Sequence, residues 1–349
     1  MSTSPARARA QSPARGVVRG AYYPSGSYAS VNPSKIDFSE SHFTHLFYAF
    51  VNPDPTTFDL VITSDDKPIL SDLVSAAHNR SPPVMVLLSI GGGGVAAVFS
   101  NMSGAEDTRS RFIRSTIEVA RENDVDGFDL DWESPKDAAE MVNLGLLFEE
   151  WRAAIDSESA TSGQRPLLLS AAVYFSNHFF LVPRYRFLSY PSSSIAKNLD
   201  WINAMCYDFH GTWDTSATGE HAALYDATSN ISTSYGLTSW TSSGVPRQKV
   251  VMGLPAYGRS WELKDAAEHG IGAPAVGVGP GVYDSGTGSA YAYKGTEWVG
   301  YDDSRSVAQK VRYAEAKGLG GYFFWTIGQD LNWTLSRQGM ALRVFNLQI

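Results

Sequence analysis

Four acidic side chains are crowded into one short apolar segment. From Asp126 to Glu133 the chain reads Asp-Gly-Phe-Asp-Leu-Asp-Trp-Glu, with further carboxylates at Asp129 and Asp131. In an extended strand alternate side chains share a face, so Asp129, Asp131 and Glu133 point the same way. Carboxyl groups crowded on one face of an apolar strand repel each other and lose hydration unless they share protons. The segment therefore favours a proton-transfer site, where neighbouring carboxylates raise the pKa of a glutamic acid.

A calcium site or a solvated acidic loop is the alternative interpretation of these acids. Calcium loops also carry Asp at alternating positions, but they are flexible polar segments with Gly and Asn. Here the intervening residues are bulky and apolar, and Phe128 and Trp132 would face a packed layer. The pattern therefore favours catalysis over metal binding.

The composition is that of a large folded domain. Of the 349 residues 43% are hydrophobic, and the formal net charge is −8. No Lys/Arg block is long enough to indicate a nucleic-acid groove. No stretch reaches the roughly 20 apolar residues of a membrane span. The nine Trp and 17 Tyr suit stacking on sugar rings, although core packing is the default interpretation of any single aromatic.

The amino-terminal residues lack the apolar core of a secretory signal, and residues 1–16 are expected to form a disordered tail. Cys206 is the one cysteine, so no internal disulfide can form, and its apolar neighbours predict a buried, inert thiol. Sequons at Asn101, Asn230 and Asn332 support secretion weakly, because such short motifs often arise by chance.

Eight apolar runs rich in β-branched and aromatic residues have the length of buried parallel strands. They lie at residues 17–22, 44–51, 84–90, 125–131, 167–174, 200–207, 249–256 and 320–326. Helical patterns lie between them. The first apolar stripe is Phe112, Ile113, Thr116, Ile117 and Ala120, and the second is Met141, Leu144, Phe148, Trp151 and Ile155. The third is Val307, Val311 and Ala314, in a helix expected to begin after an Asp303 cap and to end at Gly318. This alternation predicts an α/β fold, a (β/α)8 barrel over residues 17–349.

The acidic octapeptide resembles the Asp-x-x-Asp-x-Asp-x-Glu signature of glycoside hydrolase family 18, the chitinase family. Other segments resemble the family in the same order: Ser89-Ile90-Gly91-Gly92, Met205-Cys206-Tyr207-Asp208, Gly253 to Arg259 and Gly320 to Trp325. The resemblance runs from about Val17 to the carboxyl terminus and is closest to plant class V chitinases. It implies a TIM barrel with the active site at the carboxyl ends of the strands.

The resemblance also implies a role for each matching residue. Glu133 would protonate the leaving oxygen, and Asp131 would orient the substrate acetamide and stabilise an oxazolinium ion. Asp129 would share a proton with Asp131, and the Tyr207 hydroxyl would bond the acetamide. Asp126 falls out of phase with the other acids and is expected to be structural.

Further residues are expected to line the sugar site. Trp325 matches the tryptophan beneath the reacting sugar, and Met205 and Asp208 match residues of the same subsite. For Tyr207 and Trp325 core packing remains the alternative, and for Arg259 a surface ion pair. The remaining candidates are Tyr22, Phe50, Gly92, Tyr257 and Arg259, with Gly92 in a loop that passes close beside the site.

One interval, from Trp261 to Glu297, does not fit the barrel repeat. In many family members a small α+β subdomain here forms one wall of the substrate groove. The interval is short in this chain, so we expect a reduced insertion at about 262–297, with the subdomain mostly absent and the cleft shallow. Ser134 and Ala292 stand where class V enzymes usually have Tyr and Cys.

The resemblance implies an endo-acting chitinase. It would hydrolyse β-1,4 links between N-acetylglucosamine units of chitin or its oligosaccharides, with retention and through an oxazolinium intermediate. It would need no metal or organic cofactor, act as a monomer and have no nucleic-acid or membrane partner. Its location would be extracellular or vacuolar.

Two other functions remain open. One is a non-catalytic lectin or inhibitor on the same barrel, but such proteins usually lose the acid glutamate or the acetamide tyrosine, and Glu133, Asp131 and Tyr207 are present. The other is an endo-β-N-acetylglucosaminidase acting on N-glycans. The Met-x-Tyr-Asp element and Trp325 favour chitinase over that activity.

Overall fold

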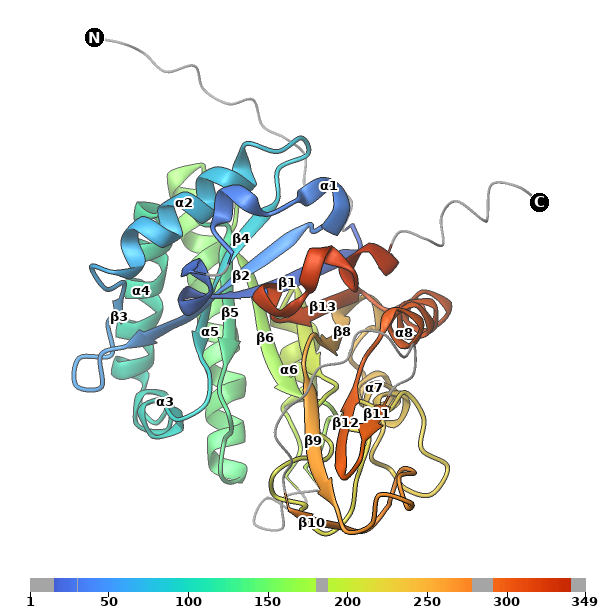
Figure 1. The fold of residues 1–349 in the computed structure, drawn as a ribbon. Helices are drawn as coiled ribbons and strands as arrows, with labels where there is room; N and C mark the ends of the chain where they lie inside the picture. The colour runs from blue at the N-terminus through green and yellow to red at the C-terminus, as the bar shows by residue number, and fades with distance from the viewer. Residues whose placement is uncertain (1–15, 30, 180–187, 278–290, 340–349) are drawn as a thin grey trace.

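A closed parallel barrel forms the centre of the molecule (Figure 1). The computed structural model describes residues 16–29, 31–179, 188–277 and 291–339; the expected tail at 1–16 lies almost wholly outside them. In these ranges the barrel strands are β1 (Val18–Pro24), β2 (His45–Pro53), β4 (Met85–Gly91), β5 (Gly127–Asp131), β6 (Leu168–Tyr174), β7 (Trp201–Met205), β8 (Val250–Pro255) and β13 (Gly321–Trp325). Strand β1 pairs in parallel with both β13 and β2, which closes the barrel. The predicted (β/α)8 fold is confirmed.

Helices surround the barrel on the outside (Figure 1). They are α1 (Phe38–Ser41), α2 (Asp66–His78), α3 (Ala96–Ser103), α4 (Glu106–Glu122), α5 (Ala138–Ser162), α6 (Ser192–Asn198), α7 (Thr233–Ser242) and α8 (Ser304–Ala316). The three predicted apolar stripes are buried on α4, α5 and α8. The Asp303 side chain caps α8 in a capping box, and Gly318 follows its end at φ +65°, as predicted. No described helix could cross a bilayer by its length and apolar content.

The alternation of side chains along each strand separates two apolar layers. On β5, Phe128 and Leu130 join the large cluster between strands and helices, together with Cys206, whose thiol pKa burial raises to about 12. A smaller cluster fills the barrel interior; its buried members are Val18, Tyr22, Phe47, Ala49, Leu87, Trp201, Val251 and Phe323. The other face of β5 carries Asp129 and Asp131, so the acids point into the barrel.

A small antiparallel sheet follows β8, in the interval where the sequence predicts a reduced insertion. Its strands are β9 (Gly258–Leu263), β10 (Ala275–Gly277), β11 (Tyr291–Lys294) and β12 (Glu297–Tyr301), in the order β10-β9-β12-β11. Trp261 and Trp298 pack edge to face in its own core, with ring centroids 5.3 Å apart. Apolar residues on β9 and β12 pair across the interval and form a folded unit, and the expectation that most of a larger α+β subdomain is absent here stays a prediction.

Ion pairs tie the elements together at the amino-terminal end of the barrel. Asp126 accepts hydrogen bonds from the Val86 amide and from His78 Nε2, each at 2.8 Å, and pairs with Arg165. Hydrogen bonding to Asp126 raises the pKa of His78. These contacts agree with the structural role expected for Asp126.

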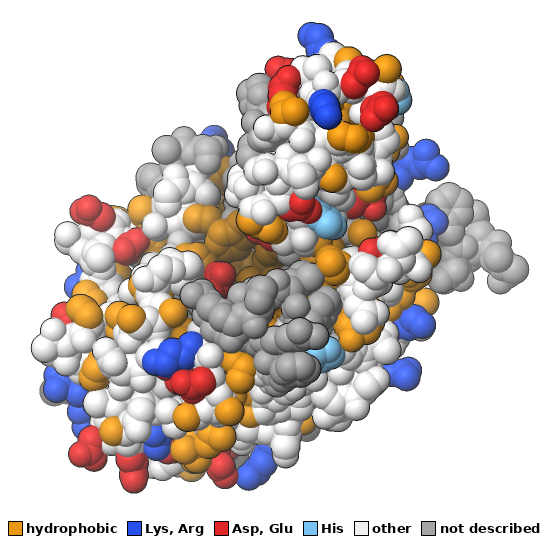
Figure 2. All heavy atoms as spheres, turned by 90° about the horizontal axis from the view of Figure 1, so that it is seen from below, with side chains coloured by type: hydrophobic (Ala, Val, Ile, Leu, Met, Phe, Trp, Pro, Cys, Tyr) orange, Lys and Arg blue, Asp and Glu red, His pale blue; other side chains and the backbone are white. Residues whose placement is uncertain are grey.

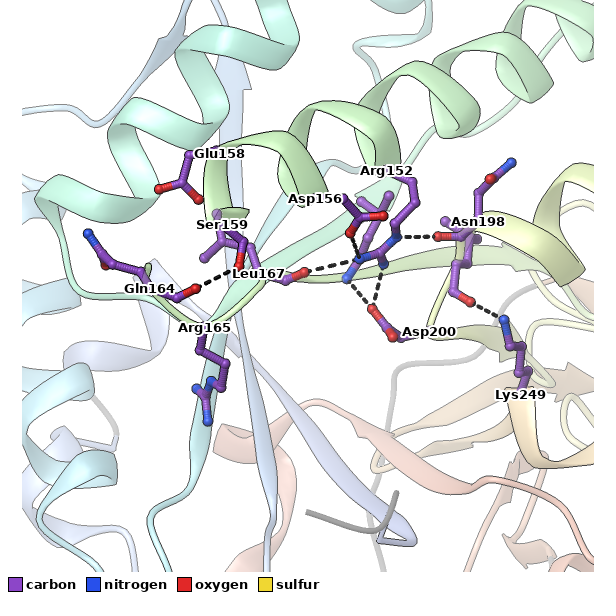
Figure 3. A network of polar contacts seen from close by, with 12 residues as sticks. Arg152, Asp156, Glu158, Ser159, Gln164, Arg165, Leu167, Asn198, Asp200 and Lys249 are labelled. Carbon is purple, nitrogen blue, oxygen red and sulfur yellow. Dashed lines mark hydrogen bonds and ion pairs between the residues drawn. The ribbon is translucent and has the colours of Figure 1, made fainter. Parts of the chain in front are cut away.

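A second network joins α5 to the strands β6 and β7 (Figure 3). Arg152 on α5 donates to the Asn198 carbonyl at 2.8 Å, to the Leu167 carbonyl at 3.4 Å and to Asp200 at 2.7 Å. Asp200 also accepts the Leu169 amide at 2.9 Å. One guanidinium therefore satisfies groups from three elements of the barrel end.

We expect Arg152→Met to lower the free energy of unfolding by about 2 kcal/mol, because it leaves a half-buried carboxylate and two carbonyls without their donor. Lys197→Met is the control: its pair with Glu149 is exposed on both sides, and the change should stay within about 0.5 kcal/mol. Urea unfolding measures both, and equal losses would contradict the role of the network.

Candidate active site

The carboxyl ends of the barrel strands meet on one hollowed face of the molecule. Figure 2 views the molecule from the side on which the small sheet projects, and hydrophobic and acidic side chains line the floor of the hollow. Met205 ends β7, Trp325 ends β13, and Glu133 follows β5 by two residues. The barrel therefore brings together residues that lie far apart in the sequence, as expected for this architecture.

Asp129 is fully buried at the centre of a cradle of donors. It accepts hydrogen bonds from the Tyr22 hydroxyl at 2.7 Å, the Ser89 hydroxyl at 3.0 Å, the Ser170 hydroxyl at 2.8 Å and the Asn203 amide at 3.1 Å. Burial raises the pKa of Asp129, and these donors oppose the rise without cancelling it. The side chain is thus fixed in orientation and keeps a greater affinity for a proton than a free aspartate.

Asp131 lies one step closer to the cleft and is also buried, at 3% exposure. Its Oδ1 atom has no hydrogen-bond partner among the described residues, while its backbone carbonyl accepts the Gly92 amide at 2.9 Å. Burial, followed by repulsion from Glu133 and Asp129, raises the pKa of Asp131 well above its usual value. A protonated Asp131 fits this position, and the predicted proton sharing with Asp129 stays a prediction.

Glu133 is the outermost of the three acids and is exposed at the surface. Loss of hydration is still the largest cause that raises the pKa of its carboxyl group, and the charge of Asp208 adds to it. A glutamic acid with a raised pKa next to open space is suited to donate a proton to a bound molecule near neutral pH.

Asp208 follows β7, two strands from β5 in the barrel, and its pKa is lowered. Its Oδ1 atom accepts a hydrogen bond from the Tyr257 hydroxyl at 2.8 Å, and two nitrogens of Arg259 approach it at 2.8 Å. Burial raises the pKa of Asp208, but contacts with His221, Tyr257 and Arg259 outweigh that effect and bring the pKa below its usual range. Arg259 is therefore an ion-pair partner within the site, and it comes from β9 of the small sheet.

Aromatic rings line the space beside the acids. Trp325 stacks on Phe50, with centroids 5.6 Å apart, and contacts Tyr22 at 5.3 Å. Tyr207 contacts Tyr257 at 6.2 Å. Trp325, Tyr207 and Phe50 are only partly buried, as is Met205, so none is an enclosed core residue. Tyr22 is 1% exposed and lies beneath the site, holding Asp129, instead of at the pocket surface.

Several residues of the site were missed by sequence reasoning. Ser89 and Ser170 are the direct register partners of Asp129 on β4 and β6, but register is not visible in the sequence. Asn203 is on β7, and its amide oxygen accepts the indole N–H of Trp201 at 3.0 Å. Trp213, after β7, is 61% exposed, and the Arg259 guanidinium lies 5.5 Å from its ring centroid. An isolated tryptophan after a strand was the only available signal for that position.

No cluster of three or more potential metal ligands occurs among the described residues. The acids and rings described above support proton transfer beside an aromatic surface. The donor set around Asp129 is made of hydroxyl and amide hydrogens, which orient a carboxyl group and do not bind a cation.

Comparisons with known proteins identify the family of the chain. The family model of glycosyl hydrolases family 18 matches residues 19–330. The class V chitinase CHIT5 of Lotus japonicus is 46% identical over 96% of this chain and 88% of that protein. A mutant class V chitinase from Nicotiana tobaccum, solved in complex with NAG4, is 38% identical, with a TM-score of 0.85, over 93% of this chain and 97% of that one. The chitinase-like agglutinin from Robinia pseudoacacia is 42% identical, with a TM-score of 0.83, over 92% and 98%.

Gly92 offers a test of the backbone that shapes the site. It has φ +83°, and a Cβ there would lie 2.7 Å from the Phe50 ring. We expect Gly92→Ala to cost roughly 2 kcal/mol of stability, because it forces a left-handed conformation and displaces the ring under Trp325. Gly93→Ala is the matched control, since a Cβ there meets nothing within 4 Å. Thermal unfolding compares them; equal midpoints would show that the Gly92 backbone tolerates a side chain.

Proposed function

Since the chain belongs to glycosyl hydrolases family 18, we propose that it is a retaining, endo-acting chitinase. Its substrate would be β-1,4-linked N-acetylglucosamine in chitin or its oligosaccharides. The observation that carries this proposal is the arrangement of Asp129, Asp131 and Glu133 along one strand, each with a raised pKa. Burial decreases from the first to the third, so the outermost acid is the one that can reach a substrate.

The acids lie on one strand and therefore cannot place one carboxyl group on each face of a sugar ring, as two-carboxylate glycosidases do. The substrate acetamide supplies the nucleophile in our proposal. Glu133 gives its proton to the glycosidic oxygen while the acetamido oxygen attacks C1 and the bond to the leaving sugar breaks. Asp131 holds the acetamide N–H, and Tyr207 donates to its oxygen.

The second step returns the site to its starting state. The Glu133 carboxylate takes a proton from a water molecule, whose oxygen attacks C1 of the oxazolinium ion and reopens the ring. Two displacements at C1 give net retention of configuration. Asp129, held by its four donors, limits where Asp131 can move during both steps.

Endo action is proposed from the position of the aromatic rings. Trp325 ends β13, which lies across the barrel from β5, and Trp213 follows β7. Aromatic faces stack on sugar rings, so sugar units can be bound on both sides of Glu133. The shallow cleft expected from the short interval after β8 would also favour endo action. We further propose a monomer with an extracellular or vacuolar location.

A non-catalytic carbohydrate-binding protein is the second candidate, because the Robinia agglutinin matches this chain as well as the chitinases do. Retention of Glu133, Asp131 and Tyr207 at one site supports the enzyme. Turnover of soluble N-acetylglucosamine oligomers discriminates between the two functions, since a lectin would bind them unchanged.

Glu133→Gln should abolish the proton donor while keeping the shape of the site. We expect the rate on N-acetylglucosamine hexamer to fall by roughly 10²- to 10⁴-fold. Binding of the tetramer, followed by calorimetry, should persist. Glu118→Gln, at an exposed position of α4, is the control with wild-type rate. A Glu133→Gln enzyme with more than about a tenth of the wild-type rate would exclude Glu133 as the general acid.

Hydrolysis should depend on the acetamide of the substrate. Fully deacetylated glucosamine hexamer lacks the internal nucleophile, so its cleavage should be slower by at least about 100-fold. Product masses and anomers, read by mass spectrometry and NMR, should show β-anomers and mixed chain lengths from the acetylated hexamer. Comparable cleavage of the deacetylated hexamer would contradict the substrate-assisted mechanism.

The alkaline side of the pH–rate profile should report the protonation of Glu133. The charge of Asp208 is one cause of the raised Glu133 pKa. Asp208→Asn removes that charge, which favours the ionised glutamate and lowers the Glu133 pKa. The alkaline limb of kcat/KM should therefore move to lower pH, whatever the loss in rate, whereas Asp265→Asn, at an exposed position between β9 and β10, should leave it in place. A limb that stays fixed or moves upward would refute this coupling.

A further inference from the structure

His221 is a buried histidine close to the site that the proposed mechanism does not use. It lies in the segment between β7 and α7, and its side chain is 1% exposed. Neither ring nitrogen has a hydrogen-bond partner among the described residues. Buried polar atoms are nearly always paired in folded proteins, so an unpaired imidazole in the interior needs an explanation.

The ring is placed against the residues that hold Asp208. Its centroid lies 5.1 Å from that of Tyr257, and its Nδ1 atom is 3.7 Å from Asp208 Oδ1. That separation is too long for a good hydrogen bond but short enough for a strong electrostatic contact. The backbone helps to fix the position, because the His221 carbonyl accepts the Phe209 amide at 2.9 Å.

A cavity of about 200 Å³ is also lined in part by His221, with Glu220, Tyr301, Asp302 and Lys310 in its wall. Lys310 and Asp302 are both buried and pair with each other, which commits the nearest cation to another partner. Both imidazole nitrogens are themselves shielded from solvent, and the polar contact recorded for the ring among the described residues is the one with Asp208.

We propose that His221 is a positioning residue, which holds the Asp208 carboxylate against Tyr257 and Arg259 from the side opposite the substrate. The inference rests on the proposed function and deepens it. Contacts in a free enzyme are often long and shorten when substrate binds, and 3.7 Å is such a distance. The contact also helps to keep the pKa of Asp208 low.

Two substitutions at His221 separate positioning from packing. His221→Phe keeps a ring against Tyr257 but removes both nitrogens, whereas His221→Asn loses the ring and keeps an N–H near the place of Nδ1. Positioning predicts that Phe lowers kcat/KM on N-acetylglucosamine hexamer by about tenfold and that Asn restores it to within about threefold of wild type. A packing role predicts the reverse order, with Phe tolerated and Asn damaging.

A double-mutant cycle completes the test. In the Asp208→Asn background, His221→Phe should cause less than about a twofold further loss, because the carboxylate it acts on is gone. Gln309→Ala, on the same cavity but away from Asp208, is the control that should match wild type. The proposal would be overturned if the losses in kcat/KM from His221→Phe and Asp208→Asn multiplied in the double variant. It would also be overturned if His221→Phe were more active than His221→Asn.

Tetramer binding and hexamer hydrolysis are measured first for the wild-type protein. If it binds N-acetylglucosamine tetramer but does not hydrolyse the hexamer, the chitinase proposal fails, and the His221 variants are then compared by tetramer affinity in the same order. If wild type hydrolyses the hexamer and His221→Phe is unaffected, the positioning role alone is wrong.

Discussion

The burial of one carboxyl group inside a parallel barrel organises this structure. A carboxylate removed from water without partners costs several kcal/mol, so Asp129 requires the donors that surround it. They come from four different strands: Tyr22 on β1, Ser89 on β4, Ser170 on β6 and Asn203 on β7. Because all of them must reach one carboxyl group, the strands around it are held in a fixed relative position. The rigid floor that results is what positions the other two acids.

The three acids of the β5 segment then differ only in their distance from water. Asp129 is saturated with donors, Asp131 has a buried oxygen without a partner, and Glu133 reaches the surface. Burial is the largest cause that raises the pKa of all three acids; hydrogen bonds oppose the rise at Asp129, whereas charge repulsion adds to it at Asp131 and Glu133. In the proposed mechanism, this order allows one short segment to supply both a buried, fixed carboxyl group at Asp129 and a proton donor at Glu133. The substrate then has to supply the nucleophile.

The barrel could be predicted from the sequence because its signals are local. Apolar runs of strand length, and the cap and stop of α8 at Asp303 and Gly318, depend on neighbours within a few residues. The strands of the small sheet could not be predicted from the sequence, because β9 pairs with β12 across more than thirty residues. Their few apolar residues are also interrupted by Gly, Glu and Ser. The donors to Asp129 were missed for the same reason: single Ser and Asn residues gain meaning only from strand register.

The small sheet contributes one charged residue to the site, through a single ion pair. Arg259 on β9 holds Asp208 after β7, and Tyr257, between β8 and β9, donates to the same oxygen. Asp208 stays ionised because of these partners, and its charge in turn raises the pKa of Glu133. The pKa of Glu133, just after β5, is therefore raised in part by a carboxylate that a residue of the small sheet holds in place. A barrel without that sheet would keep the acidic strand but would lose Arg259, one of the contacts that lower the pKa of Asp208.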